Sequence, residues 1–269
     1  MRVALLVLCA LTTAAGLVAT PRAAAQIVNV QPLVTRADKE GFQGELTGSL
    51  KLQTGNSQLF LVDAGLLALY GKGIHRLISS SSASLGYRGG INDESRFLQR
   101  LFTHLRWQVR LPRLVTWETY AQAAQDRFRR LSLRVLGGTG PRFDFIEGNA
   151  VSLALGLSYM LEHERLSSTE LSDGTTDPGV SETNHRASLY LSARFSIAPA
   201  FSFIHSSYFQ PLLTDPFGDF RFSSETGLAI AVTKRLSIAI VFAVSFDSEP
   251  PAEVKKTDTT TDVKLAVAF

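Results

Sequence analysis

The sequence contains one cysteine among 269 residues and has little net charge. With Cys9 alone, neither a disulfide framework nor a zinc site built from cysteines is possible. The 27 Lys and Arg residues are nearly balanced by 24 Asp and Glu residues, which argues against a nucleic-acid-binding protein. No run of about 20 apolar residues occurs beyond the N-terminus, so a helical membrane protein is excluded. These absences leave two classes, a soluble β protein and a membrane β-barrel.

The first 25 residues have the three parts of a secretory signal peptide. Arg2 supplies the positive charge, residues 3–18 form an apolar segment, and residues 23–25 (AAA) offer a small-residue cleavage site. The apolar segment is too short to span a bilayer. We therefore predict an exported protein with a signal peptide at residues 1–25, followed by a short periplasmic lead-in at residues 26–41.

From residue 42 onward, apolar and polar residues alternate. In residues 151–161, for example, Val, Leu and Tyr at odd positions alternate with Ser, Ala, Gly and Met at even positions. Strict alternation places one set of side chains on each face of a β-strand. The pattern predicts an all-β chain of about twelve strands, at residues 42–53, 58–70, 76–88, 95–110, 114–126, 129–143, 149–162, 185–197, 200–211, 219–232, 235–247 and 259–269.

The connections between the predicted strands alternate in length. Short turns such as residues 71–75 alternate with connections that include the long loops at residues 164–182, 213–218 and 247–258. Outer-membrane barrels have short turns on the periplasmic side, long loops outside, and aromatic residues near the strand ends. In this sequence, too, many aromatic residues lie near the ends of the predicted strands. We therefore predict a transmembrane antiparallel up-and-down β-barrel at residues 42–269, in the outer membrane of a Gram-negative bacterium.

The C-terminal residue of the chain, Phe269, ends an alternating segment. This ending resembles the C-terminal signature of bacterial outer-membrane barrels, which the outer-membrane assembly machinery recognises. We expect that machinery and the outer-membrane lipid to be partners of a monomeric barrel that binds no cofactor and no nucleic acid.

Four short fragments resemble one protein family: residues 54–57 (TGNS), 134–143 (RVLGGTGPRF), 156–164 (GLSYMLEHE) and 207–215 (SYFQPLLTD). The family is domain of unknown function 481, which includes proteins described as salt-induced outer-membrane proteins. The resemblance covers most of residues 42–269. It implies an outer-membrane barrel, but it brings no established activity and no catalytic residues.

The polar side chains of the predicted strands form the candidate site, because a membrane barrel turns them to its lumen. The candidate lumen-lining residues are Glu45, Lys51, Arg100, His104, Arg106, Arg110, Glu118, Arg134, Arg186, Arg194, Arg221, Glu225 and Lys264. Bases prevail in this set, whereas the long loops are rich in acids, and a ring of cations in a pore favours anions. The first hypothesis is therefore a narrow porin-like channel for small solutes, with anions favoured.

The second hypothesis is a closed barrel with an envelope-structural or salt and osmotic-stress role. In this alternative the lumen arginines pair with carboxylates and fill the interior with a polar network. The carboxylates available for such pairing are Glu45, Glu118, Glu162 and Glu225.

Signs of catalysis or metal binding are few, and we expect no enzyme. The five histidines lack the spacing of common metal motifs, and residues 137–140 (GGTG) predict a bend or bulge rather than a phosphate loop. His205 and Ser207 share a strand face, as the His and Ser of the outer-membrane phospholipase do. An activated serine also needs a group that orients its base, and none is evident. A lipid hydrolase is therefore the third hypothesis.

Overall fold

The structure is a computed structural model that describes residues 40–267, apart from residues 55–57, 90, 92–94, 149, 173, 199, 234–235 and 253. The predicted signal peptide at residues 1–25, all but the last two residues of the lead-in, and Phe269 lie outside the described residues. The backbone of Glu45 and Lys264 is described, but their side chains are not.

Twelve strands form one antiparallel sheet in which neighbours in space follow the order of the chain. This confirms the predicted all-β, up-and-down arrangement. The strands are β1 (Gly41–Gln53), β2 (Leu59–Lys72), β3 (His75–Arg88), β4 (Arg96–Leu111), β5 (Val115–Asp126), β6 (Leu131–Glu147), β7 (Val151–Leu166), β10 (Ser181–Ala198), β11 (Phe201–Leu212), β12 (Asp215–Ala231), β13 (Leu236–Asp247) and β14 (Thr257–Val267).

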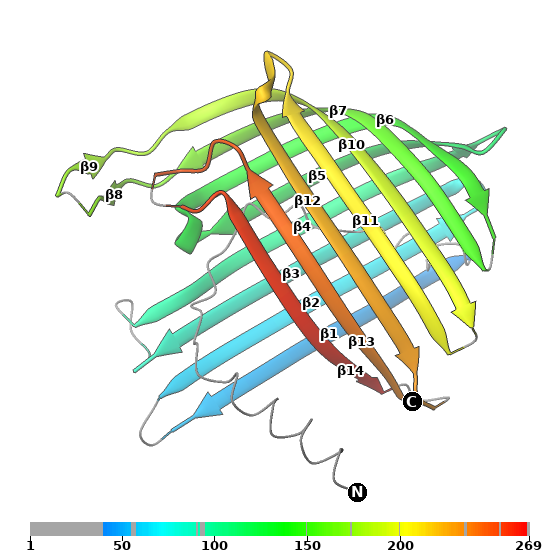
Figure 1. Cartoon of the computed structure of the whole chain (residues 1–269), viewed down its shortest axis with the longest axis horizontal. Helices are drawn as coiled ribbons and strands as arrows, with labels where there is room; N and C mark the ends of the chain where they lie inside the picture. Colours follow the sequence, from blue (N-terminus) through cyan, green and yellow to red (C-terminus); the bar gives the residue numbers. More distant parts are fainter. Residues whose placement is uncertain are drawn as a thin grey trace, which may run out of the picture.

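The sheet curls upon itself into a barrel, with β11 to β14 passing in front of β1 to β4 in Figure 1. β1 and β14 are the first and last strands of the sheet order, and the described residues include no pairing between them. Two short elements lie in the connections. The hairpin of β8 (Thr169–Glu170) and β9 (Thr176–Asp177) stands between β7 and β10, and the 3-10 turn η2 (Arg127–Arg129) joins β5 to β6.

One predicted long loop is wrong. Residues 213–218 are predicted to form a long loop, but β11 ends at Leu212 and β12 already begins at Asp215. A register shift after Pro211 absorbs the irregular residues within the strand pair.

β6 has no bulge at residues 137–140, where a bend or bulge was predicted. β6 continues through these residues, and its register shifts lie near its two ends instead. The glycines serve close packing: a Cβ atom on Gly138 would collide with the ring of Tyr120, and one on Gly140 would collide with the backbone of Leu157.

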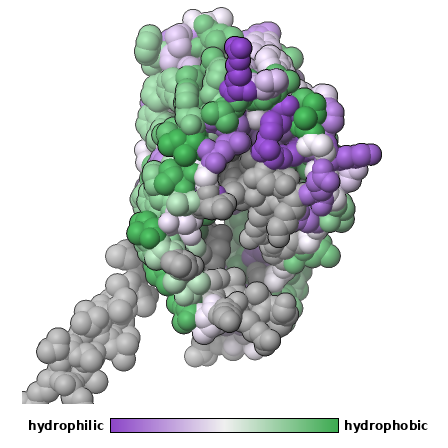
Figure 2. Space-filling view, turned by 90° about the vertical axis from the view of Figure 1, so that its right-hand side faces the viewer, coloured by the Kyte–Doolittle hydropathy of each residue, from purple (hydrophilic) through white to green (hydrophobic). Residues whose placement is uncertain are grey.

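Alternating side chains point to opposite sides of the curved sheet, and the two sides differ in chemistry. On β4, Arg106 points inward and is 4% exposed, whereas its neighbours Leu105 and Trp107 point outward and are 47% and 46% exposed. Figure 2 shows hydrophobic residues along the flank of the barrel and strongly hydrophilic ones gathered toward one end. In the part of the chain that the structure describes, no helix is long and apolar enough to cross a membrane.

A charged network inside the barrel as the candidate site

Glu162, on β7, lies at the centre of a large buried network of charged side chains. Its carboxylate accepts hydrogen bonds from Arg134 on β6 (Nε to Oε2, 2.8 Å), Arg186 on β10 (Nε to Oε1, 3.3 Å) and Arg221 on β12 (Nη1 to Oε1, 2.7 Å). Glu162 is 0% exposed. A buried carboxylate is stable only when charge and hydrogen bonds compensate its lost hydration, and the three guanidinium groups supply both.

The same arginines bind further carboxylates toward the loop end of the barrel. Arg221 also donates to Glu164 (2.7 Å) and to Asp247 (3.0 Å). Arg186 forms a two-pronged pair with Asp219, with Nη1 and Nη2 at 2.9 and 3.0 Å from the carboxylate oxygens. Planar guanidinium groups suit such paired contacts. The network therefore joins β6, β7, β10, β12 and β13 from inside.

Glu118, on β5, holds the second network. It accepts hydrogen bonds from Arg106 (3.3 Å), from Gln108 Nε2 (2.6 Å) and from the hydroxyl of Tyr190 on β10 (2.7 Å). The guanidinium of Arg106 also lies over the rings of Tyr120 and Tyr190, at 5.4 and 5.8 Å from their centroids. Through Tyr190, side chains of β4 and β5 contact a strand that lies beyond β6 and β7 in the sheet.

Two consecutive arginines after β5 connect the loops at one end of the barrel, which we call the mouth. Arg129 binds Asp258 of β14 at 2.8 Å, and Arg130 binds Asp177 of the β8–β9 hairpin at 2.8 Å. Arg130 also donates to the carbonyl oxygen of Ala252, in the β13–β14 connection, at 3.4 Å. Its φ of 63° is uncommon for a residue other than glycine, so the surrounding contacts hold this residue in a strained conformation.

The charge of this mouth contact affects Asp177 directly. Hydrogen bonds from Arg130 and from the backbone N–H of Gly179 lower the pKa of Asp177 below its usual value. The ionised carboxylate is therefore the form that fits the mouth contacts.

Little space remains between the two buried networks. A cavity of about 20 Å³ lies between His104, Arg106, Arg134 and Tyr190, among other residues, which is room for about one water molecule. At the loop end a larger recess of about 310 Å³ is lined by charged residues that include Arg129, Arg186, Arg221 and Glu182. The space between the two networks is therefore largely filled by side chains.

The described lumen candidates fall into two groups. Arg106, Glu118, Arg134, Arg186 and Arg221 are buried within the networks, and His104 is buried beside them with its ring 6.0 Å from that of Tyr120. Lys51 and Arg110 are exposed, whereas Arg100, Arg194 and Glu225 are partly buried. Arg100 pairs with Asp126 (3.1 Å), Arg110 with Glu147 (3.5 Å), and Arg194 donates to the carbonyl of Gly148 (3.2 Å).

The sequence interpretation missed several members of the networks. Glu164, Asp177, Asp219, Asp247 and Asp258 were counted as loop acids, yet all five bind arginines of the interior or the mouth. The acid-rich loops and the base-rich strands therefore neutralise each other. For Glu164 and Asp258 the reason is strand length, because β7 and β14 extend past their predicted ends and include these residues.

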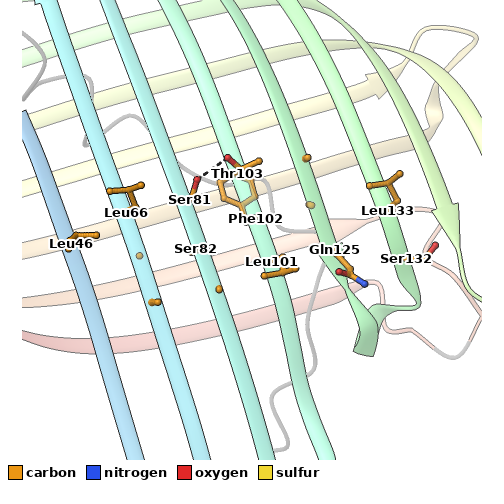
Figure 3. Close-up of a pocket in the computed structure, with 15 residues that line it drawn as sticks. Leu46, Leu66, Ser81, Ser82, Leu101, Phe102, Thr103, Gln125, Ser132 and Leu133 are labelled. Carbon is orange, nitrogen blue, oxygen red and sulfur yellow. Dashed lines mark hydrogen bonds between the residues drawn. The ribbon is translucent and has the colours of Figure 1, made fainter. Parts of the chain in front are cut away.

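The outer face carries a shallow apolar hollow of about 570 Å³ across β1 to β6. Leu46, Leu66, Leu101 and Leu133 stand around small side chains there, and Ser81 and Thr103 share a hydrogen bond of 2.9 Å (Figure 3). Within the described residues, no group of three or more His, Cys, Asp or Glu could hold a metal ion.

His205 and Ser207 lie together on the outer face of β11. Ser207 Oγ is 2.8 Å from His205 Nε2, and His205 Nδ1 is 2.9 Å from the hydroxyl oxygen of Thr226 on β12. The orienting group that the sequence did not reveal is thus present, on the neighbouring strand.

Comparison with known proteins places the chain in a family. The family model described as "Protein of unknown function, DUF481" matches residues 47–269. The chain belongs to the DUF481 family. The assignment made from the four sequence fragments is thereby confirmed, and the matched region contains most of β1 and all of the later strands.

Solved structures similar to this chain include a porin and an autotransporter domain. The NanC porin shares 10% identity with a TM-score of 0.48, and the match covers 84% of this chain and 99% of that one. The translocator domain of the autotransporter NalP from Neisseria meningitidis shares 9% identity with a TM-score of 0.43, covering 89% of this chain and 93% of that one. No curated protein sequence matches this DUF481 chain.

Proposed function

We propose that this DUF481 protein is an integral β-barrel of the Gram-negative outer membrane whose lumen is held closed by its charged network. One observation carries the proposal: the strands bury charge inside and expose apolar residues outside. Arg134 and Glu162 are 2% and 0% exposed, whereas the outward Leu157 and Leu161 on β7 are 46% and 43% exposed. A barrel in water would place these two sets the other way round.

Closure of the lumen is supported by the ion pairs. A cation attracts anions through a pore only when its charge is not already neutralised by the protein. Glu118 and Glu162, two of the four carboxylates considered as partners, bind Arg106, Arg134, Arg186 and Arg221. The role that fits this geometry is in the integrity of the envelope under salt or osmotic stress rather than in bulk transport.

A narrow anion-favouring channel is the second candidate. It is supported by Lys51, which belongs to the inward set of its strand and is exposed. Conductance distinguishes the two candidates. A closed lumen gives no discrete current steps in a planar bilayer, whereas the channel gives steps whose reversal potential in a salt gradient indicates anion selectivity.

We also propose how the chain is exported, processed and assembled. We expect export with cleavage of residues 1–25, recognition of Phe269 by the outer-membrane assembly machinery, and a monomeric barrel in lipid. Mass spectrometry of the protein from outer-membrane fractions tests the cleavage, and removal of Phe269 should lower the amount of assembled protein.

A further inference from the structure

We infer that Ser207, His205 and Thr226 form a nucleophile, base and orienting group on the outer face, and that they hydrolyse an acyl ester of a membrane lipid. The inference rests on the proposed function, because the outer face meets lipid only if the barrel spans the membrane. It assigns a chemical activity to a surface rather than to the lumen.

Strand register brings the three side chains together. His205 on β11 is paired directly with Thr226 on β12, and Ser207 is paired with Ser224. Residues two apart on one strand and their direct cross-strand partners share a face. The triad is therefore built on two adjacent strands of the sheet, which hold its members more rigidly than loops would.

The hydrogen bonds suit activation of the serine. With the ring proton on Nδ1, His205 donates to Thr226 Oγ1 (2.9 Å) and accepts the hydroxyl proton of Ser207 at Nε2 (2.8 Å). Both ring nitrogens are thus engaged, and in this tautomer the ring is oriented to take a proton from the nucleophile. A threonine is uncharged, so we expect this triad to be slower than one oriented by a carboxylate.

Another histidine of the outer face lacks this arrangement. His163 Nδ1 binds the hydroxyl of Thr183 at 2.9 Å, as His205 binds Thr226. Two residues further along the strand, however, stands Arg165 rather than a serine. A His–Thr pair alone therefore only satisfies the hydrogen-bonding capacity of two polar side chains on this face. The site at His205 differs because a serine also contacts the histidine.

The surroundings of Ser207 point to a lipid substrate. His205 stacks on Phe203 with ring centroids 6.3 Å apart, and the cross-strand partner of Ser207 on β10 is the exposed Leu191. Acyl chains are the molecules that cover such apolar surfaces in a membrane.

The depth of the site agrees with an ester substrate. Phe209, two residues after Ser207, belongs with Phe220 and Phe246 to an aromatic cluster near the loop end of β11, with ring centroids 5.5 and 5.4 Å apart. Aromatic clusters of this kind lie at the membrane interface. Two residues of a tilted strand amount to about 5 Å of depth, so Ser207 lies just below the interface, close to where ester bonds join acyl chains to headgroups.

The reaction proceeds in two steps with water as the second reactant. Ser207 Oγ attacks the ester carbonyl carbon while His205 Nε2 takes the hydroxyl proton. The bond to the lipid alcohol breaks, the alcohol oxygen receives the proton from His205, and an acyl-serine ester remains. His205 then removes a proton from water, the hydroxide attacks the acyl carbon, and the fatty acid leaves as Ser207 regains its proton. The hydroxyl oxygen of Ser224, 3.3 Å from Ser207 Oγ, is a second acceptor within reach of the serine hydroxyl.

A fluorophosphonate probe on the purified, folded protein tests the activated serine. We expect the probe to label Ser207, and S207A to abolish the labelling. H205Q should slow it by about 10²- to 10⁴-fold, the contribution of a general base. T226V should slow it on the order of fivefold, the factor of one neutral hydrogen bond, and T226S should restore it. S81A and T183V remove similar outer-face hydroxyls elsewhere and should leave the labelling unchanged.

Vesicles of phosphatidylethanolamine and phosphatidylglycerol test the lipid substrate. The wild-type protein should release fatty acid from them, and S207A should not. Absence of labelling at Ser207 in a folded protein, or labelling that H205Q leaves unchanged, overturns the inference. If the strands are protected from protease in the same vesicles but no fatty acid is released, the hydrolase inference is overturned and the proposed membrane barrel stands. Strands that stay open to protease instead contradict the proposed membrane barrel and, with it, the inference.

Discussion

Arg221 on β12 and Glu162 on β7 are 59 residues apart in the sequence, yet their charged groups lie 2.7 Å apart inside the barrel. β10 and β11 separate their two strands in the sheet, so the pair ties distant strands together across the curved interior. Both groups are buried, and a buried ion pair is favourable only with further hydrogen bonds. Arg221 makes them by donating to Glu164 and Asp247.

Replacing Glu162 by Gln tests how much the network around Glu162 stabilises the barrel. The change leaves Arg134, Arg186 and Arg221 around a neutral amide, and loss of one partner of a buried pair costs about 3–5 kcal/mol. Urea unfolding of the purified barrel, followed by tryptophan fluorescence, gives the free energy of unfolding. The matched control is E147Q, since Glu147 pairs with Arg110 on the surface at 41% exposure, where such pairs contribute about 0–1 kcal/mol. Equal effects of the two variants would contradict the assigned role of Glu162.

Replacing Tyr190 by Phe removes the hydroxyl that donates to Glu118 and keeps the ring over Arg106. Because a hydrogen bond to a charged group contributes about 1.5–3 kcal/mol, the unfolding free energy should fall by that amount. Y70F, at a tyrosine exposed on the outer face, should change it little. A Y190F barrel as stable as the wild type would mean that Glu118 is satisfied without this bond.

Gly156 makes room for Tyr190, because a Cβ atom at this position would collide with the tyrosine ring. G156A should therefore displace the ring and destabilise the barrel by about 1–3 kcal/mol, the usual effect of overpacking. At Gly137 the nearest atom to a new Cβ is 3.7 Å away, an ordinary contact. G137A is thus the matched control, and a similar loss in both variants would show that strand glycines matter for reasons other than this ring.

Acid should weaken the contact between Arg130 and Asp177 at the mouth. The pKa of Asp177 is lowered by hydrogen bonds from Arg130 and Gly179, so its stabilising effect is complete above the usual aspartate pKa of about 4. The effect disappears as the pH falls through the lowered pKa. Hydrogen exchange of the Gly179 amide, which binds Asp177 at 2.9 Å, should lose protection in this acid range. D177N should lack that step, and protection independent of pH in the wild type would contradict the prediction.

The strands could be predicted from the sequence because their period is simple. In residues 151–161 one face carries Leu and Tyr and the other small or polar residues, and β7 indeed begins at Val151. Its end was placed four residues too early, at residue 162. The alternation fades there because Glu162 and Glu164, both turned inward, are followed by the polar residues His163 and Arg165 rather than by apolar ones.

The site was harder to predict because its members depend on register between distant strands. Arg106 and Arg221 were identified as inward residues from alternation alone, but nothing in the sequence indicates that Tyr190 reaches Glu118 across 72 residues. The same limit applies outside the barrel. Thr226 stands beside His205 only because β11 and β12 pair with residue 205 opposite residue 226.

The most direct test of the closed lumen is single-channel recording of the purified protein in a planar bilayer with a salt gradient. The paired arginines predict a folded, inserted barrel without discrete conductance steps. Current steps whose reversal potential shows anion selectivity would contradict the closed lumen. If R106E lowers that selectivity, the narrow channel is favoured.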